Sequence, residues 1–316
     1  MKRLIFILIS IVLLAVSCER KVLLEPGHHH GEEVFISVNI NAALDPEIQT
    51  GDTPDMYRSI LKTARTVTVV AYPTDDRGVY GVHKIKGLEG SIWLLPGTYD
   101  ILLYTSDFYD LDGTFYRGLT DFYSAEAYTN QVKSSKTKEL VKSYDMDEPD
   151  PLFVQTYKNF EVKAGENRIE GGLKPMNYKY WYEVQVTGLD YITSAWLEID
   201  GMYTSVFMST GEHMYDEYGN QRIESQILKD ENKIKGEFFS FGPHQDSNVD
   251  NSIVITFVNG RTIRLEMDDI SSSIKKLTKG GEIVIEQKIV INVGDTGSGF
   301  TPEVKDWDEQ EVYIPI

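Results

Sequence analysis

"SIVITFVNGRTIRLEM" (residues 252–267) carries the clearest fold signal in this 316-residue sequence. Apolar residues recur at every second position on both sides of the pair Asn259-Gly260, which is typical of two strands joined by a tight turn. Because Asn and Gly both tolerate positive φ, the pair predicts a β-hairpin with a type I′ turn. The stretch therefore indicates antiparallel β structure.

The same two-residue alternation recurs along most of the chain, which predicts many short strands separated by turns. The stretches are residues 33–40, 65–72, 93–107, 158–173, 178–189, 195–208, 235–242 and 280–293. Helix signals are few. One short helix is predicted at 53–64, with Thr53 as cap and Pro54 at its first position, and another at 267–277, with Asp268 as a possible cap. This pattern predicts an all-β protein built from antiparallel β-sandwiches.

Two domains fit the sequence better than one. Strand signals group into residues 33–173 and residues 174–316, and "GGLKPMN" (171–177) lies between the two groups. Its glycines and proline interrupt regular structure. We therefore expect two tandem β-sandwiches, an N-terminal one over 33–173 and a C-terminal one with a terminal strand over 174–316.

The first residues have the pattern of an export signal. Lys2 and Arg3 precede an apolar run from Leu4 to Val16 that only Ser10 interrupts. Such a run would reach only about 20 Å as a helix, which is short of the ~30 Å hydrocarbon core of a bilayer. Residues 1–17 are therefore predicted to be a signal peptide rather than a permanent membrane span.

The single cysteine of the chain, Cys18, directly follows this segment. With Ala15, Val16 and Ser17 it resembles a lipobox, the site at which bacterial lipoproteins are acylated on cysteine. We expect Cys18 to carry the lipid and residues 18–32 to form a tether, because two buried acyl chains already anchor a protein stably. A simple secreted protein is the alternative. A lipidated Cys18 would leave no thiol for a disulfide or for a metal site.

The charge of the chain limits its partners. It has 31 Lys and Arg against 49 Asp and Glu, a net charge of −18. This charge repels phosphate backbones, so nucleic acid is not an expected partner. The 41% content of hydrophobic residues is enough to bury one large core or two smaller ones.

No motif for catalysis or for a cofactor stands out. Asp295-Thr296-Gly297 resembles the turn of an aspartic protease, but those enzymes need two such carboxylates and there is no second copy. His28–His30 lie in the predicted tether, where a preorganised metal site is not expected. The carboxylate-rich stretches "DLDGTF", "MDEPD" and "DEYGN" are read as solvated turns, with weak calcium binding as the alternative. We expect no enzyme activity and no cofactor.

Two segments are candidates for binding. The aromatic-rich stretch 108–128 would fill a sandwich core if it is buried, or bind a glycan or a matrix protein if it is exposed. The C-terminal tail "VKDWDEQEVYIPI" (304–316) ends in the alternating residues Val312, Tyr313 and Ile314. The tail is either the last strand of its own sheet or a strand that adds to the sheet edge of a partner.

Taken together, these residues resemble a known family. The lipobox, "LPGTYDILLY", "WLEIDGMYTSVFMSTGE", "GEFFSFGP", "VNGRTIRLEMDDI" and the tail are similar to fimbrillin-like lipoproteins of the Bacteroides group, nearest to fimbrial anchor and accessory subunits and their uncharacterised lipoprotein relatives. The resemblance implies two transthyretin-like β-sandwiches, lipid attachment at Cys18, an outer-membrane location and fimbrial subunits as protein partners. It leaves open the face of the membrane, and glycan binding remains the alternative function.

Polymerising members of that family are cut by an arginine-specific protease, which removes their first strand. Here no arginine occurs between Arg20 and Arg58, so a cut at Arg58 or Arg65 would discard the strand predicted at residues 34–40. An uncleaved, lipid-attached anchor fits this spacing more simply.

The lipid prediction can be tested by fractionation. We expect Cys18→Ala to move the protein from the membrane fraction to the soluble fraction, because the thiol that carries the acyl chains is lost. Immunoblots of washed membranes would measure the shift. Unchanged retention of the variant in membranes would contradict lipidation at Cys18.

Overall fold

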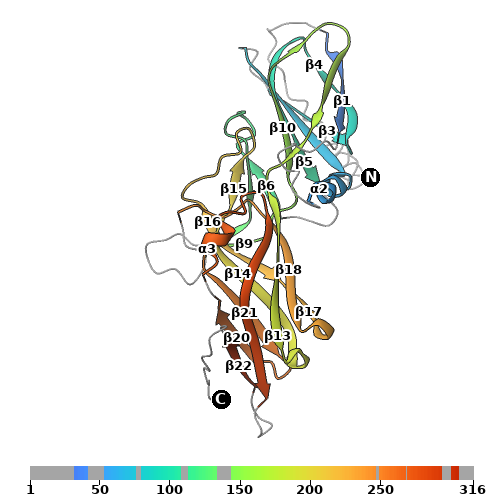
Figure 1. Ribbon diagram of the computed structural model, residues 1–316. Helices are drawn as coiled ribbons and strands as arrows, with labels where there is room; N and C mark the ends of the chain where they lie inside the picture. Colours follow the sequence, from blue (N-terminus) through green and yellow to red (C-terminus); the bar gives the residue numbers. More distant parts are fainter. Residues whose placement is uncertain are drawn as a thin grey trace, which may run out of the picture. The chain divides into compact units, whose positions relative to one another are not determined.

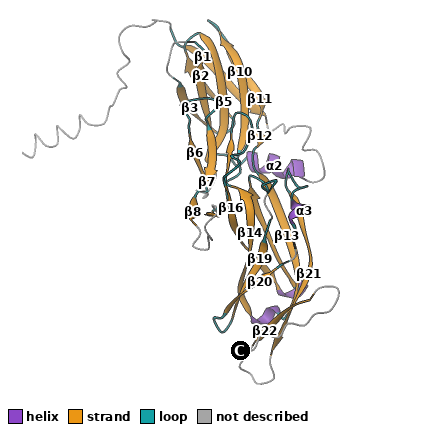
Figure 2. Ribbon diagram, turned by 90° about the vertical axis from the view of Figure 1, so that its left-hand side faces the viewer, coloured by secondary structure: helices purple, strands orange, loops and turns teal. Residues whose placement is uncertain are grey.

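The computed structural model describes residues 32–41, 53–75, 80–107, 113–133, 144–246, 249–267, 269–293 and 300–305. Strands dominate these residues, as Figure 2 shows in orange, and helices are short. The expected all-β class is therefore confirmed. Five sheets are present in the described chain, and we name each after its central strand.

Two sheets form the first layered unit. The β1 sheet has the order β11-β1-β4, and the β5 sheet has the order β12-β10-β5-β2-β3. Figure 1 shows most of these strands in blue to green. Their bounds are β1 Val34–Asn41, β2 Thr66–Pro73, β3 Gly81–Lys86, β4 Glu89–Leu94, β5 Gly97–Asp107, β10 Phe153–Val162, β11 Asn167–Gly172 and β12 Lys174–Pro175.

One apolar cluster holds these two sheets together. Alternate residues of the strands point into it, such as Ile36 and Val38 of β1 and Val67 and Val69 of β2. The helix α2 (Thr53–Leu61) contributes to the same cluster, so the helix predicted from residue 53 is confirmed and belongs to the core. Burial of these side chains is the main favourable contribution to the free energy of folding of this unit.

Two further sheets form the second layered unit around a separate cluster. The β13 sheet has the order β17-β18-β13-β21-β22, and the β14 sheet has the order β20-β19-β14-β16-β9-β8. Tyr180 and Val184 of the β13 sheet meet Leu197 and Ile253 of the β14 sheet in this cluster. The strands are β8 Gln131–Lys133, β9 Tyr144–Met146, β13 Tyr178–Thr187, β14 Ile192–Tyr203, β16 Tyr218–Glu224, β17 Gln226–Leu228, β18 Lys233–Ser240, β19 Asn251–Phe257, β20 Thr262–Glu266, β21 Gly281–Val293 and β22 Phe300–Lys305.

Short helices connect some of these strands. They are the 3₁₀ turns η2 (Leu189–Tyr191) and η3 (Lys229–Glu231) and the α-helix α3 (Ser271–Ile274). The helix predicted at 267–277 is therefore present but short. The carboxylate of Asp269 accepts a hydrogen bond from the N–H of Ser271 (2.8 Å), and the predicted cap Asp268 lies outside the described residues.

The fifth sheet covers the outer face of the β5 sheet. The β7 sheet consists of β6 (Thr114–Arg117), β7 (Glu126–Thr129) and β15 (Ser205–Phe207) in the order β15-β7-β6. Val70 and Leu102, on the face of the β5 sheet opposite to Val69 and Leu103, pack in one cluster with Ala127 and Val206 of this sheet. The β5 sheet is therefore buried on both faces, which explains the run of six buried residues within β2.

The hairpin predicted at residues 252–267 is confirmed, but its turn is of another type. β19 and β20 pair in antiparallel register, and only Gly260 of the Asn-Gly pair has a positive φ, 82°. The Gly260 N–H donates to the Phe257 carbonyl (2.9 Å), and the Phe257 N–H donates to the Arg261 carbonyl (2.8 Å). The connection thus has three residues with a left-handed glycine at its end, and the predicted type I′ turn is wrong.

The predicted purely antiparallel pairing is also wrong in three places. β1 pairs with β11, β13 with β21 and β9 with β16 in parallel, so three of the sheets are mixed. Parallel neighbours need long connections, and each of these pairs joins strands that are far apart in the sequence. A local alternation pattern carries no information about such partners.

The boundary expected at residues 173 and 174 stays a prediction. The strands β6 to β9 precede this boundary, yet β7 pairs with β15 and β9 pairs with β16, which both follow it. The β12 strand (Lys174–Pro175) follows the boundary and pairs back with β10. The chain therefore exchanges strands across the predicted boundary in both directions.

Because the β5 sheet is buried on both faces, we expect substitutions at two adjacent positions to lower the free energy of unfolding by similar amounts. Leu102→Ala and Leu103→Ala should each lower the free energy of unfolding by about 2–5 kcal/mol, because each removes a buried side chain from a different cluster. Lys84→Ala, at an exposed position of β3, should stay within about 0.5 kcal/mol and serves as the control. Urea unfolding would measure all three, and a small loss for Leu102→Ala would contradict coverage by the β7 sheet.

Candidate functional site

The residues that the sequence singles out for attachment and strand donation lie outside the described residues. This holds for Cys18 and for Val312, Tyr313 and Ile314, and it also holds for His28–His30 and Asp295–Gly297. Their roles stay predictions. What the structure does describe is the strand from which the tail departs, the first strand of the chain, and the surfaces that surround them.

The tail follows an edge strand. β22 (Phe300–Lys305) pairs antiparallel with β21, from Val293 opposite Phe300 to Lys288 opposite Lys305, and it is the last strand of the β13 sheet in the described chain. The outer side of an edge strand presents backbone N–H and C=O groups that a further strand can pair with. The residues proposed to donate a strand, Val312 to Ile314, come later in the chain than this edge strand, which ends at Lys305.

The first strand is not at an edge. β1 lies between β4 on one side and β11 on the other, with six paired positions in each ladder. Its inward residues Ile36, Val38 and Ile40 are buried in the cluster of the first unit. Removal of β1 would therefore open both ladders and expose an apolar strip along the cluster.

The aromatic-rich stretch 108–128 is only partly a surface feature. Phe122 is buried, and Tyr116 is half-buried against the same cluster and donates from its hydroxyl to the Thr105 carbonyl (2.8 Å). Phe115 and Tyr123 are exposed, by 41% and 55%. Phe108 and Tyr109 lie outside the described residues. Of the described aromatic residues of this stretch, Phe122 and Tyr116 therefore pack in the core, whereas Phe115 and Tyr123 are exposed.

A bidentate ion pair fixes the outer face of β6 and β7. Arg117 Nε and Nη2 contact the two carboxylate oxygens of the buried Glu126 at 2.6 and 2.8 Å, and Nη2 also contacts Glu217 at 3.0 Å. The guanidinium lies 4.9 Å from the ring centre of Tyr128, which in turn packs against Phe115 at 5.8 Å. This geometry raises the pKa of Arg117, chiefly through its hydrogen bonds to Glu126.

The carboxylates of "MDEPD" have a structural role in this part of the chain. Asp150 accepts hydrogen bonds from the N–H groups of Gly113 and Thr114 at 3.2 and 3.1 Å. Glu148 accepts one from the N–H of Phe239 (2.8 Å), and its burial raises its pKa. The acidic loop thus connects the start of β6 to the end of β18. The described residues contain no group of three or more His, Cys, Asp and Glu side chains that could hold a metal ion.

Two histidines that look isolated in the sequence pack around one tyrosine. His213 stacks on Tyr203 with ring centres 4.2 Å apart, and His244 lies 5.1 Å from Tyr203 on a tilted plane. His213 Nδ1 is 2.9 Å from the Ser205 carbonyl, and burial lowers the pKa of His213. His244 is therefore buried and His213 is half-buried, so neither side chain is fully exposed to solvent. Both histidines pack against Tyr203, which comes from another part of the sequence. A pattern of neighbouring residues does not reveal this packing.

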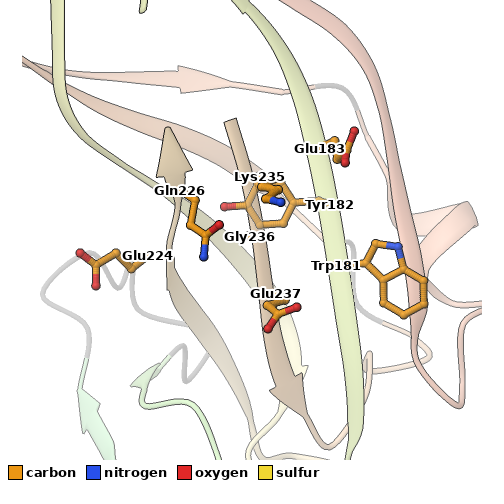
Figure 3. A pocket seen from close by; sticks show the side chains of 8 residues that line it. All are labelled: Trp181, Tyr182, Glu183, Glu224, Gln226, Lys235, Gly236 and Glu237. Atoms are coloured by element: carbon orange, nitrogen blue, oxygen red, sulfur yellow. The ribbon is translucent and has the colours of Figure 1, made fainter. Parts of the chain in front are cut away.

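A hollow of about 430 Å³ lies on the β13 sheet (Figure 3). Trp181 and Glu183 come from β13, Lys235 and Glu237 from β18, and Glu224 and Gln226 from the chain around β17. Lys233 contacts Glu183 at 2.7 Å and Lys179 contacts Glu237 at 2.8 Å, so two of the carboxylates already have cationic partners. The lining offers an aromatic ring and hydrogen-bonding groups for a polar molecule, but no nucleophile next to a base.

The described chain has no helix long and apolar enough to cross a membrane.

Comparison with known proteins agrees with this architecture. A protein of Bacteroides ovatus named "Putative fimbrium anchoring subunit Fim4B" is 24% identical over 242 residues, which cover 74% of this chain and 63% of that protein. The chain thus spans less than two thirds of the length of this relative. The resemblance to fimbrial anchor proteins of the Bacteroides group is confirmed.

Solved structures support the fold. A crystal structure described as "a putative adhesin" from Bacteroides ovatus gives a TM-score of 0.55 at 17% identity, and the match covers 89% of this chain and 95% of that one. The fimbrial anchor protein Mfa2 from Porphyromonas gingivalis gives a TM-score of 0.43 at 11% identity, covering 87% and 98%, which is too low to assign a fold.

One family model matches residues 57–221, from the middle of α2 into β16, and it is described as "Domain of unknown function (DUF5119)". Because this match covers more than half of the chain, the protein belongs to that family.

Proposed function

We propose that this protein is a non-catalytic, lipid-anchored subunit of the outer membrane that anchors or accompanies fimbriae and binds its protein partners by strand addition. The observation that carries the proposal is the similarity over 242 residues to a protein named as a fimbrium anchoring subunit. The all-β fold supports it, because mixed and antiparallel sheets present edges to which a further strand can add.

An anchor must keep its attachment and its fold on one chain. A cut after Arg58 would separate Cys18 and β1 from the remaining strands, so the proposed role requires that this bond stays intact. The environment of α2 supports this requirement. Tyr57 and Leu61 are fully buried, and the ring of Tyr57 packs against Phe153 with centres 6.1 Å apart.

A hydrogen bond adds to this packing. The hydroxyl of Tyr57 accepts from the backbone N–H of Lys179 in β13 (2.9 Å), so α2 is held by both apolar contacts and the main chain of a distant strand. A protease needs several residues in an extended conformation, and α2 must leave the cluster before Arg58 can enter an active site. Such local opening is costly when a segment is buried and hydrogen-bonded.

Binding of a surface glycan or of a matrix protein is the alternative function. The exposed Phe115 is the observation that favours it: its ring packs at a tilt against Tyr128, which lies under the guanidinium of Arg117, and an exposed aromatic ring held in this way can stack on a sugar ring. The anchor role explains more features of the sequence, because it also gives a role to Cys18 and to the tail that follows β22.

Deletion of the tail tests the strand-addition part of the proposal. Removal of residues 311–316 should abolish co-purification with fimbrial subunits. Tyr313→Pro should act similarly, because proline removes a backbone N–H that strand pairing needs. Tyr313→Phe leaves the main chain unchanged and should bind as the parent does. If the deletion lowers only the melting temperature while partners are retained, the tail is the last strand of its own sheet.

Limited proteolysis tests the intact anchor. An arginine-specific protease should leave the bond after Arg58 uncut in the native protein and cut it after heat unfolding, as mass spectrometry of the fragments would show. Tyr57→Ala should make this bond susceptible, because it removes both the buried ring and the hydrogen bond to Lys179. Arg58→Lys in the same background should abolish the new fragment. Rapid cleavage of the native parent after Arg58 would contradict a permanently attached anchor.

A further inference from the structure

Two aromatic side chains are exposed side by side at the start of the first strand. Phe35 in β1 and Trp93 in β4 are directly opposite in the antiparallel ladder, and their rings meet edge to face with centres 5.5 Å apart. They are 44% and 52% exposed, whereas their chain neighbours Ile36 and Ile92 are buried in the core.

The pair differs in polarity from the rest of this sheet face. The other outward positions of the β1 sheet carry polar or charged side chains, as expected for a solvated face. They are Ser37, Asn39, Glu89, Ser91, Arg168 and Glu170. The exposed apolar surface is therefore confined to one end of this face, where β1 begins and β4 ends.

That end is where the chain arrives from the predicted tether. Phe35 is the second residue of β1, and it follows Cys18 by 17 positions. Even a fully extended chain of this length spans at most about 60 Å. The position of a lipid on Cys18 thus limits how far the aromatic pair can move from the bilayer, and it raises the local concentration of the pair at the membrane surface.

We propose that Phe35 and Trp93 insert into the interfacial layer of the membrane and form a second, non-covalent contact beside the lipid anchor; this inference rests on the proposed lipidation of Cys18. Indole and phenyl rings are favoured at the boundary between headgroups and acyl chains. Two rings alone bind weakly, so the contact depends on the anchor to hold it near the bilayer.

Charge selects the kind of membrane surface. The chain has a net charge of −18, and Glu32 and Glu33 directly precede β1. An anionic surface would repel this end of the molecule, whereas a zwitterionic headgroup layer would not. The occupant of the aromatic pair is therefore a lipid surface with little net charge, and binding should depend only weakly on salt.

Quenching of tryptophan fluorescence tests the contact in the protein purified from bacterial membranes. The protein would be reconstituted into phosphatidylethanolamine and phosphatidylcholine vesicles in which part of the lipid is brominated near the top of the acyl chains. The chain has four tryptophans, Trp93, Trp181, Trp196 and Trp307. We expect quenching in the parent, loss of most of it in Trp93→Phe, and no loss in Trp181→Phe, which serves as the matched control on the β13 sheet.

The outcomes separate this inference from the proposed function. Retention of the protein on washed vesicles reports the lipid anchor, and quenching of Trp93 reports the aromatic contact. An anchored protein whose Trp93 is unquenched overturns the inference and leaves the anchor role intact, and it would indicate that the tether or a partner covers the pair. A protein that washes off the vesicles overturns both. Quenching that persists in Trp93→Phe but disappears in Trp181→Phe would place the contact on the wrong sheet and also overturn the inference.

Discussion

Burial of one sheet on both faces is the constraint on which the rest of this structure depends. The β5 sheet packs against the β1 sheet and α2 through Val67, Val69 and Leu103, and against the β7 sheet through Val70 and Leu102. Since apolar burial is the dominant favourable term in folding, a sheet with two apolar faces requires a cover on each. The second cover includes β15, a strand from residues 205–207, so residues distant in the sequence must assemble before the first unit is complete.

The pairing of β1 explains how the proposed anchor would remain folded and attached. The predicted tether leads into β1, which is paired on both sides, and α2, the next described element, is buried in the same apolar cluster as β1. A pull on the tether is therefore resisted by two ladders and an apolar cluster rather than by a peripheral strand. The tail that we propose to bind partners, in contrast, comes after β22, which is at a sheet edge in the described chain.

The sequence predicts the local parts of this fold well. Alternation identifies the strands, and the Asn259-Gly260 pair locates a hairpin, because both depend on neighbouring residues. It does not reveal that Val70 and Tyr72 are buried along with Val69, because alternation cannot report a sheet that covers the second face. The parallel partner of β1 and the packing of His213 and His244 around Tyr203 escape it for the same reason, since each joins distant residues. Cys18 is predicted from local sequence alone, whereas the Phe35–Trp93 pair needs the register of two strands.

The chemical state of the mature amino terminus tests the central claim most directly. Mass spectrometry of the protein extracted from membranes should find Cys18 as the first residue, with its sulfur carrying a diacylglyceryl group and its amino group acylated. An unmodified amino terminus, or a mature chain that begins beyond Cys18, would contradict a lipid-held anchor.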